Sequence, residues 1–124
     1  MSFTTQAIAS PLVTNFAKDT LSNLTVETVT GSAAELYFVE ISNPNASSAC
    51  YVKIFAAANS SAITGQHTLQ LYCPSNSTVY YYIPTSLTIS SGIQFYVSTT
   101  PGIQSGNNTL SAPGTAVTVK IGHS

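Results

Sequence analysis

From about residue 24 onward, apolar and polar residues alternate in short segments that are separated by Gly, Pro and Asn. A period of two places successive side chains on opposite faces of a β-strand. Such segments, broken about every 8–12 residues, are typical of sandwiches and barrels, and no window has a helical stripe. The expected strands are 24–30, 35–41, 50–56, 67–73, 77–83, 87–89, 92–98 and 115–121. We therefore predict a single antiparallel β-sandwich of about eight strands, either a jelly roll or an Ig-like sandwich.

The first 20 residues follow a different pattern. Their apolar residues are scattered, and Pro11 interrupts any helix. We predict an extended N-terminal arm over residues 1–20, with room for one short strand, and a sandwich domain over residues 21–124. Ordering a backbone costs about 1–2 kcal/mol per residue. We therefore expect the arm to be mobile in the isolated chain and to become ordered against a partner surface.

The alternation also predicts one strand pairing. If Lys53 faces water, Cys50, Val52 and Ile54 point inward, and if Gln70 faces water, Leu69, Leu71 and Cys73 do so. The inward pairs Cys50–Cys73, Val52–Leu71 and Ile54–Leu69 all fit one antiparallel register. The same reasoning on the other strands predicts a core of Val39, Ile41, Val52, Ile54, Leu69, Leu71, Tyr81, Ile83, Ile93, Phe95, Val97, Val117 and Val119.

Large apolar side chains also fall on the outward positions of these strands. A contiguous apolar patch on a protein surface indicates an interface, and interfaces are enriched in aromatic residues. The alternative is that loops or the N-terminal arm cover these residues. The predicted protein interface consists of Leu36, Phe38, Tyr51, Phe55, Tyr80, Tyr82 and Tyr96.

Charged residues are scarce, and this excludes several function classes. They make up 6% of the chain, Arg is absent, and the net charge is −1. Nucleic acids and anionic lipids require clustered basic residues, so neither is an expected partner. No run approaches the ~20 apolar residues of a membrane span, and no secretory signal is visible, so we expect synthesis in a cytoplasm. A neutral, hydroxyl-rich surface lacks the charge repulsion that keeps proteins apart, so it favours a subunit of an assembly. A monomer can also have such a surface.

The residues capable of chemistry do not form a catalytic or metal-binding pattern. His67 and His123 have no carboxylate near them in sequence, and the odd separation of Glu35 and Glu40 predicts opposite strand faces. A zinc set of Cys50, Cys73 and the two histidines lacks the usual Cys-x₂₋₄-Cys spacing. The two cysteines are expected to be buried thiols. We predict no enzyme activity, no cofactor and no metal.

Carbohydrate binding is the main alternative for a β-sandwich with exposed aromatic residues. Such sites use aromatic platforms with charged and amide partners. Tyr80, Tyr82 and Tyr96 are the candidates for a platform, although the chain has neither Trp nor Arg.

Three segments resemble small virion proteins of tailed bacteriophages. Tyr51 to Phe55, followed by Ala56 to Ala58 and Thr64-Gly65, is similar to their strand, small residues and Thr-Gly turn. The segments 86–99 and 114–121 resemble later strands of the same proteins. The resemblance covers about residues 36–121 and is a pattern of strands and turns rather than an invariant motif.

This resemblance implies a structural protein of the phage particle. The expected function is capsid decoration (cement): a homo-oligomer, favoured as a trimer, binds the major capsid protein outside the head and stabilises joints between subunits. The expected location is therefore the capsid surface of the virion. One alternative is a tail-fibre or tail-tip module that binds a host glycan, and another is an Ig-like domain of a larger adhesin.

Overall fold

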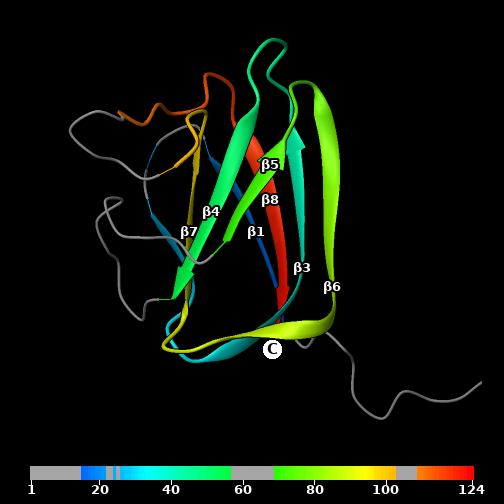
Figure 1. The fold of residues 1–124 in the computed structure, drawn as a ribbon, viewed down its shortest axis with the longest axis vertical. Coiled ribbons are helices and arrows are strands. Elements are labelled where there is room, and N and C mark those ends of the chain that lie inside the picture. The colour runs from blue at the N-terminus through cyan, green and yellow to red at the C-terminus, as the bar shows by residue number, and fades with distance from the viewer. Residues whose placement is uncertain (1–14, 22–23, 25, 57–68, 103–108) are drawn as a thin grey trace, which may run out of the picture.

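A computed structural model shows that the chain folds as an antiparallel β-sandwich (Figure 1). The structure describes residues 15–21, 24, 26–56, 69–102 and 109–124, and only the backbone at 15–19 and 21. Within these residues there are eight strands: β1 (Asn15–Leu21), β2 (Glu27–Thr30), β3 (Ala34–Asn43), β4 (Cys50–Ala56), β5 (Leu69–Cys73), β6 (Ser77–Ile89), β7 (Ile93–Ser98) and β8 (Val117–His123). The predicted fold class is confirmed.

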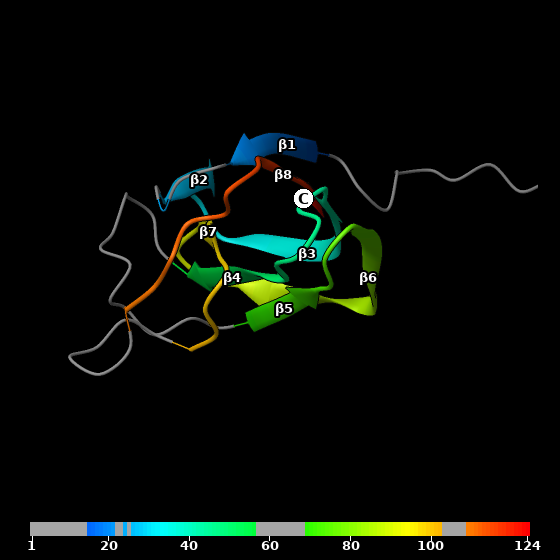
Figure 2. The same cartoon turned by 90° about the horizontal axis from the view of Figure 1, so that it is seen from above.

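The strand order decides between the two predicted topologies. Sheet A has the order β1-β8-β3-β6, and sheet B has the order β2-β7-β4-β5. The pairs β1–β8, β2–β7, β3–β6 and β4–β5 are all antiparallel, as in one long hairpin wrapped over itself. This order is a jelly roll, whereas an Ig-like sandwich places its strands as ABED and CFG. Viewed from above, β1 and β2 lie along one side of the sandwich and β5 and β6 along the other (Figure 2).

Two expected boundaries differ from the structure. The predicted arm over residues 1–20 leaves room for one short strand, and residues 15–21 form such a strand, β1, which pairs with β8 and so belongs to the sandwich. Residues 1–14, and with them most of the predicted arm, lie outside the described residues. The segments 77–83 and 87–89 form one strand, β6, with Pro84 inside it. Proline is tolerated there because β6 is at the edge of sheet A.

The predicted core fills the space between the sheets. Nine of its thirteen residues are buried, and Leu69, Leu71, Tyr81 and Ile83 are partly buried against them. The hairpin register is also confirmed, because Cys50, Val52 and Ile54 pair with Cys73, Leu71 and Leu69. Alternation sufficed here because the inward side chains of these strands form one apolar cluster between the two sheets.

Two buried asparagines fix the turns at one end of the sandwich. The Asn43 side chain donates to the carbonyls of Ser48 (2.9 Å) and Pro74 (3.1 Å). Asn45 donates to Asn43 Oδ1 (2.7 Å) and to the Thr115 carbonyl (3.0 Å), and it accepts from the Thr115 amide (2.8 Å). These bonds satisfy backbone groups that turns leave without strand partners. They tie the β3–β4 and β5–β6 connections to the segment that leads into β8.

Candidate interaction surface

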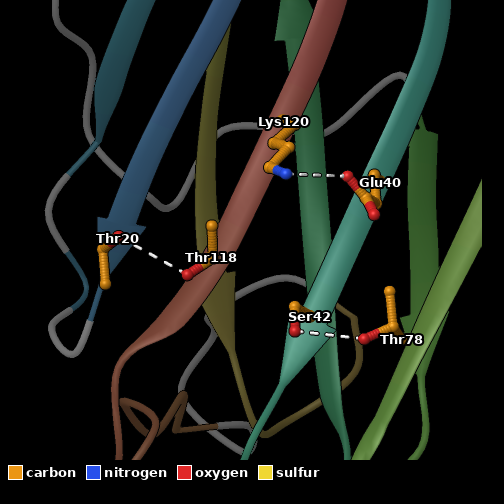
Figure 3. A network of polar contacts seen from close by, with 6 residues as sticks. All are labelled: Thr20, Glu40, Ser42, Thr78, Thr118 and Lys120. Atoms are coloured by element: carbon orange, nitrogen blue, oxygen red, sulfur yellow. Dashed lines mark hydrogen bonds and ion pairs between the residues drawn. The ribbon is translucent and has the colours of Figure 1, made fainter.

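The outer face of sheet A carries a row of hydroxyl groups across its four strands. Thr20 pairs with Thr118 and Ser42 with Thr78, at oxygen–oxygen distances of 3.5 and 3.1 Å (Figure 3). The middle pair, Ser42 and Thr118, are register neighbours on β3 and β8. Cross-strand hydroxyl pairs of this kind stabilise a sheet modestly. They also leave an uncharged polar strip on the surface.

Two charged groups of this face form an ion pair beside that strip. Lys120 Nζ on β8 lies 3.4 Å from Glu40 Oε2 on β3 (Figure 3). The two residues are directly opposite in the register. An exposed pair of this kind contributes at most about 1 kcal/mol to stability. Its main consequence is that the charges of Glu40 and Lys120 offset each other.

An aromatic cluster occupies the next positions of the same face. Phe38 and Tyr80 have ring centroids 6.0 Å apart, and Tyr82 lies opposite Phe38 in the register. Tyr80 is 61% exposed and Tyr82 is 70% exposed, whereas Phe38 is half-buried. Phe38 lies against the backbone of Gly122, where a Cβ would overlap its ring. We call Phe38, Tyr80 and Tyr82 the aromatic patch.

Leu36 does not belong to this surface, and its predicted exposure is wrong. A β-bulge interrupts the β3–β6 and β3–β8 registers between Leu36 and Phe38. The extra residue, Tyr37, reverses the alternation, so Leu36 is fully buried in the core. Tyr37, which strict alternation predicts to be inward, is half-buried and outside the core cluster. Nothing in the local sequence marks the bulge, because neither residue is glycine.

On sheet B, two predicted interface residues form a second, smaller core. Phe55 and Tyr96 point outward from the sandwich as expected, but they are buried. Their rings are 6.2 Å apart in an edge-on arrangement and pack with Leu110, Leu24 and Val26. The segments before β2 and after β7 therefore cover this face. For these two residues, the prediction of an exposed interface is wrong and the alternative of covering loops holds.

Lys53 is buried beneath the same cover. Its Nζ donates to the carbonyl of Thr100 at 2.7 Å and to that of Gly102, and it lies 5.4 Å from the centre of the Tyr96 ring. Burial lowers the pKa of this amine to about 8. The expectation that Lys53 faces water is correct about the sheet face and wrong about exposure. The lysine instead holds the loop after β7 against sheet B.

The remaining predicted interface residue lies on β4, next to the edge strand of sheet B. Tyr51 is half-buried, and its ring centroid is 5.5 Å from that of Tyr72 on β5. Tyr72 itself is 47% exposed. The sequence analysis did not select Tyr72, although the outward assignment of Gln70 implies an outward Tyr72. These two tyrosines belong to a different face from the aromatic patch.

The groups considered for chemistry are not brought together. The bulge places both Glu35 and Glu40 on the outer face of sheet A, which corrects the expectation of opposite faces. Glu35 accepts hydrogen bonds from Ser86 (2.5 Å) and Thr88 (2.8 Å), which lower its pKa. Their register partners on β6, Thr88 and Tyr80, lie eight residues apart, so the two carboxylates do not form a pair.

The residues considered and rejected as a zinc set are also separated. Cys50 and Cys73 are adjacent, buried thiols in sheet B, whereas His123 is on β8 of sheet A and contacts the Ser124 carbonyl. Burial raises the pKa of Cys50 to about 12 and also raises that of Cys73. His67 lies outside the described residues. No cluster of three potential metal ligands occurs among the residues that the structure describes.

Comparisons with known proteins give no relative. No protein-family model, no curated protein and no solved structure matches the chain. In the described part of the chain, no helix is long and apolar enough to cross a membrane.

Proposed function

We propose that the chain is a non-enzymatic structural protein of a phage particle: a capsid decoration (cement) protein that binds the outside of the head. It acts as a homo-oligomer, for which we expect a trimer, and it stabilises joints between subunits of the major capsid protein. The observation that carries this proposal is the aromatic patch on the outer face of sheet A, beside the Glu40–Lys120 ion pair. Exposed, clustered aromatic side chains are what protein interfaces use as anchors.

The charge distribution supports a partner that is itself a packed protein surface. Glu40 and Lys120 neutralise each other, and hydroxyl groups make up the polar part of the face. Such a surface binds by apolar packing and hydrogen bonds rather than by ionic attraction. We therefore expect binding to depend weakly on salt. The jelly roll supports the proposal as an analogy only, because this fold serves capsid proteins, lectins and enzymes alike.

Binding of the purified chain to capsids that lack it tests the proposal. Replacing Tyr80 and Tyr82 together by Ser should abolish binding, while the melting temperature stays within a few degrees of the original. Tyr72→Ser is the matched control, because Tyr72 is an exposed tyrosine on sheet B, and it should bind normally. Occupied capsids should also release their DNA at a higher temperature than bare capsids.

A tail module that binds a host glycan is the second candidate, and the aromatic patch is the observation that favours it. Phe38 and Tyr80 lie beside Glu40 and Lys120, so rings and polar groups are adjacent. Tyr96 is buried, so the platform predicted from the sequence loses one member. A chain that ignores capsids but binds host polysaccharide, with loss of binding in the Tyr80 and Tyr82 variant, would replace the first proposal by this one.

A further inference from the structure

An apolar groove opens at the β5–β6 side of the sandwich, and it shares Tyr82 with the aromatic patch. Its volume is about 260 Å³. The lining comes from both sheets and reaches the buried core residue Val39; it comprises Val39, Leu69, Leu71, Tyr81, Ile83 and Leu87, with Ser86 and Tyr82 at the side. An apolar cavity of about 150 Å³ holds a benzene molecule. This groove therefore has room for an aromatic ring and an aliphatic side chain.

The groove exists because the two edge strands are unequal. β5 has five residues and β6 has thirteen. The Tyr81 hydroxyl donates to the Tyr72 carbonyl and joins the two edges at that level. β6 continues past this level to Ile83 and Leu87. β5 does not run beside that part of β6, because β5 starts at Leu69. In the described part of the chain, each of these strands pairs on one side only, so their free edges can accept an extended segment.

We infer that this groove binds the N-terminal segment, residues 1–14, of a neighbouring copy of the chain. This inference rests on the part of the proposed function that makes the chain a homo-oligomer. The segment has no charged residue, and its large apolar residues are Met1, Phe3, Ile8, Leu12 and Val13. A groove with an aliphatic and aromatic lining matches this chemistry, because burial of both surfaces is favourable and no charge has to lose its water.

The segment is long enough to reach beyond its own chain to a neighbouring copy. Fourteen extended residues span up to roughly 46 Å. The segment starts at Asn15 on β1, and β6 is three strands away in sheet A, a distance of about 14 Å. Four or five residues would therefore cross the sheet of the same chain. Contact of one copy's segment with the next copy's groove is a heterologous contact, which forms a ring when the rotation between copies closes. We expect a ring of three.

Disulfide trapping in the full-length chain tests whether residues 1–14 of one copy bind the groove of another copy. A chain with both Leu12→Cys and Ser86→Cys should form covalent rings or chains of several copies on a non-reducing gel, most of it as trimer. The single variants should not, and they control for the buried Cys50 and Cys73. A product that stays at the mass of one chain overturns the inference, whether the link forms within the chain or not at all.

A second measurement does not depend on cross-linking geometry. Replacing Phe3, Ile8, Leu12 and Val13 together by Ser should lower the solution mass to that of one chain, at concentrations where the original is oligomeric. The control replaces Thr4, Thr5 and Gln6 by Ser and should keep the original mass. An unchanged oligomer in the first variant overturns the inference. Capsid binding by the original chain is measured separately. An oligomer that does not bind capsids would therefore contradict the proposed function without contradicting the contact between copies.

Discussion

The outer faces of the two sheets have similar sequences and opposite environments. On sheet A, Phe38, Tyr80 and Tyr82 lie on an open surface. On sheet B, Phe55 and Tyr96 are buried under Leu110 and the segment before β2. In both sheets the aromatic residues occupy outward positions of regular strands. The difference comes from the connections, because the segments around β2 and after β7 cross sheet B and none of the described connections covers the aromatic patch.

This contrast explains why the lysines on the two outer faces, Lys120 and Lys53, have different environments. Lys120 on sheet A remains partly exposed in an ion pair with Glu40. Lys53 on sheet B is fully buried and bonds to the carbonyls of Thr100 and Gly102. A loop that crosses a sheet brings backbone carbonyls that need donors. The buried lysine supplies them, and the loop in turn covers the aromatic side chains.

The largest difference in stability is expected between replacing a buried tyrosine, Tyr96, and replacing an exposed one, Tyr82. Tyr96→Ala should lower the free energy of unfolding by about 3–5 kcal/mol, because it leaves a cavity under the loop. Tyr82→Ala should change it by less than about 0.5 kcal/mol, because most of that side chain is in water. Urea denaturation measures both. Equal losses would mean that the two faces do not differ as described.

The bulge in β3 should produce the next largest effect. Leu36→Ala should cost about 3 kcal/mol, as expected for a buried leucine. Phe38→Ala should cost only about 1 kcal/mol, because its ring is half-exposed. Without the bulge, Leu36 would lie on the open face. A smaller loss for Leu36 than for Phe38 in the same denaturation assay would therefore contradict the observed register.

The buried lysine should make stability depend on pH in a predictable direction. The pKa of Lys53 is about 8 in the folded chain against 10.5 for an ordinary lysine. Between these values the unfolded chain holds a proton that the folded chain has released, so stability rises with pH. Relative to Lys53→Met, the original chain should gain roughly 2 kcal/mol from pH 8 to 10.5, a gain that the two carbonyl acceptors reduce.

The comparison with Lys53→Met isolates this titration. Tyrosines and cysteines also titrate above pH 9, but they are present in both proteins and cancel in the difference. The lost hydrogen bonds of the variant add a constant offset. A difference in unfolding free energy that is flat from pH 7 to 10.5 would show that the Lys53 amine is not desolvated.

The smallest effect concerns the glycine beneath the aromatic patch. Gly122→Ala should cost about 1 kcal/mol, because the new Cβ overlaps the Phe38 ring, which can swing toward solvent. The cost should vanish when Phe38 is already Ala. Gly114→Ala is the control, because its Cβ would make only an ordinary contact 3.7 Å from Asn45 Oδ1. Thermal denaturation of the four variants gives the comparison, and a cost that persists without Phe38 would assign it to the backbone.

The amino-acid sequence by itself determined the sandwich, its core and one strand register. Val52, Ile54, Leu69 and Leu71 lie where alternation places them. Inward positions are predictable because their apolar side chains gather in the core between the sheets, whichever strands pair. A period of two is therefore sufficient for the interior wherever a strand contains no bulge, and Leu36 is the exception.

Only the tertiary structure decided which outward residues meet solvent. Tyr82 and Tyr96 have the same local pattern, and a connection distant in sequence buries one of them. Leu36 is inward because one extra residue enters β3 opposite β6 and β8, and the evidence for that lies in the partner strands. Strand order was equally open, since a jelly roll and an Ig-like sandwich share one alternation. Exposure, bulges and order all depend on contacts between segments far apart in the chain, and local periodicity does not encode those contacts.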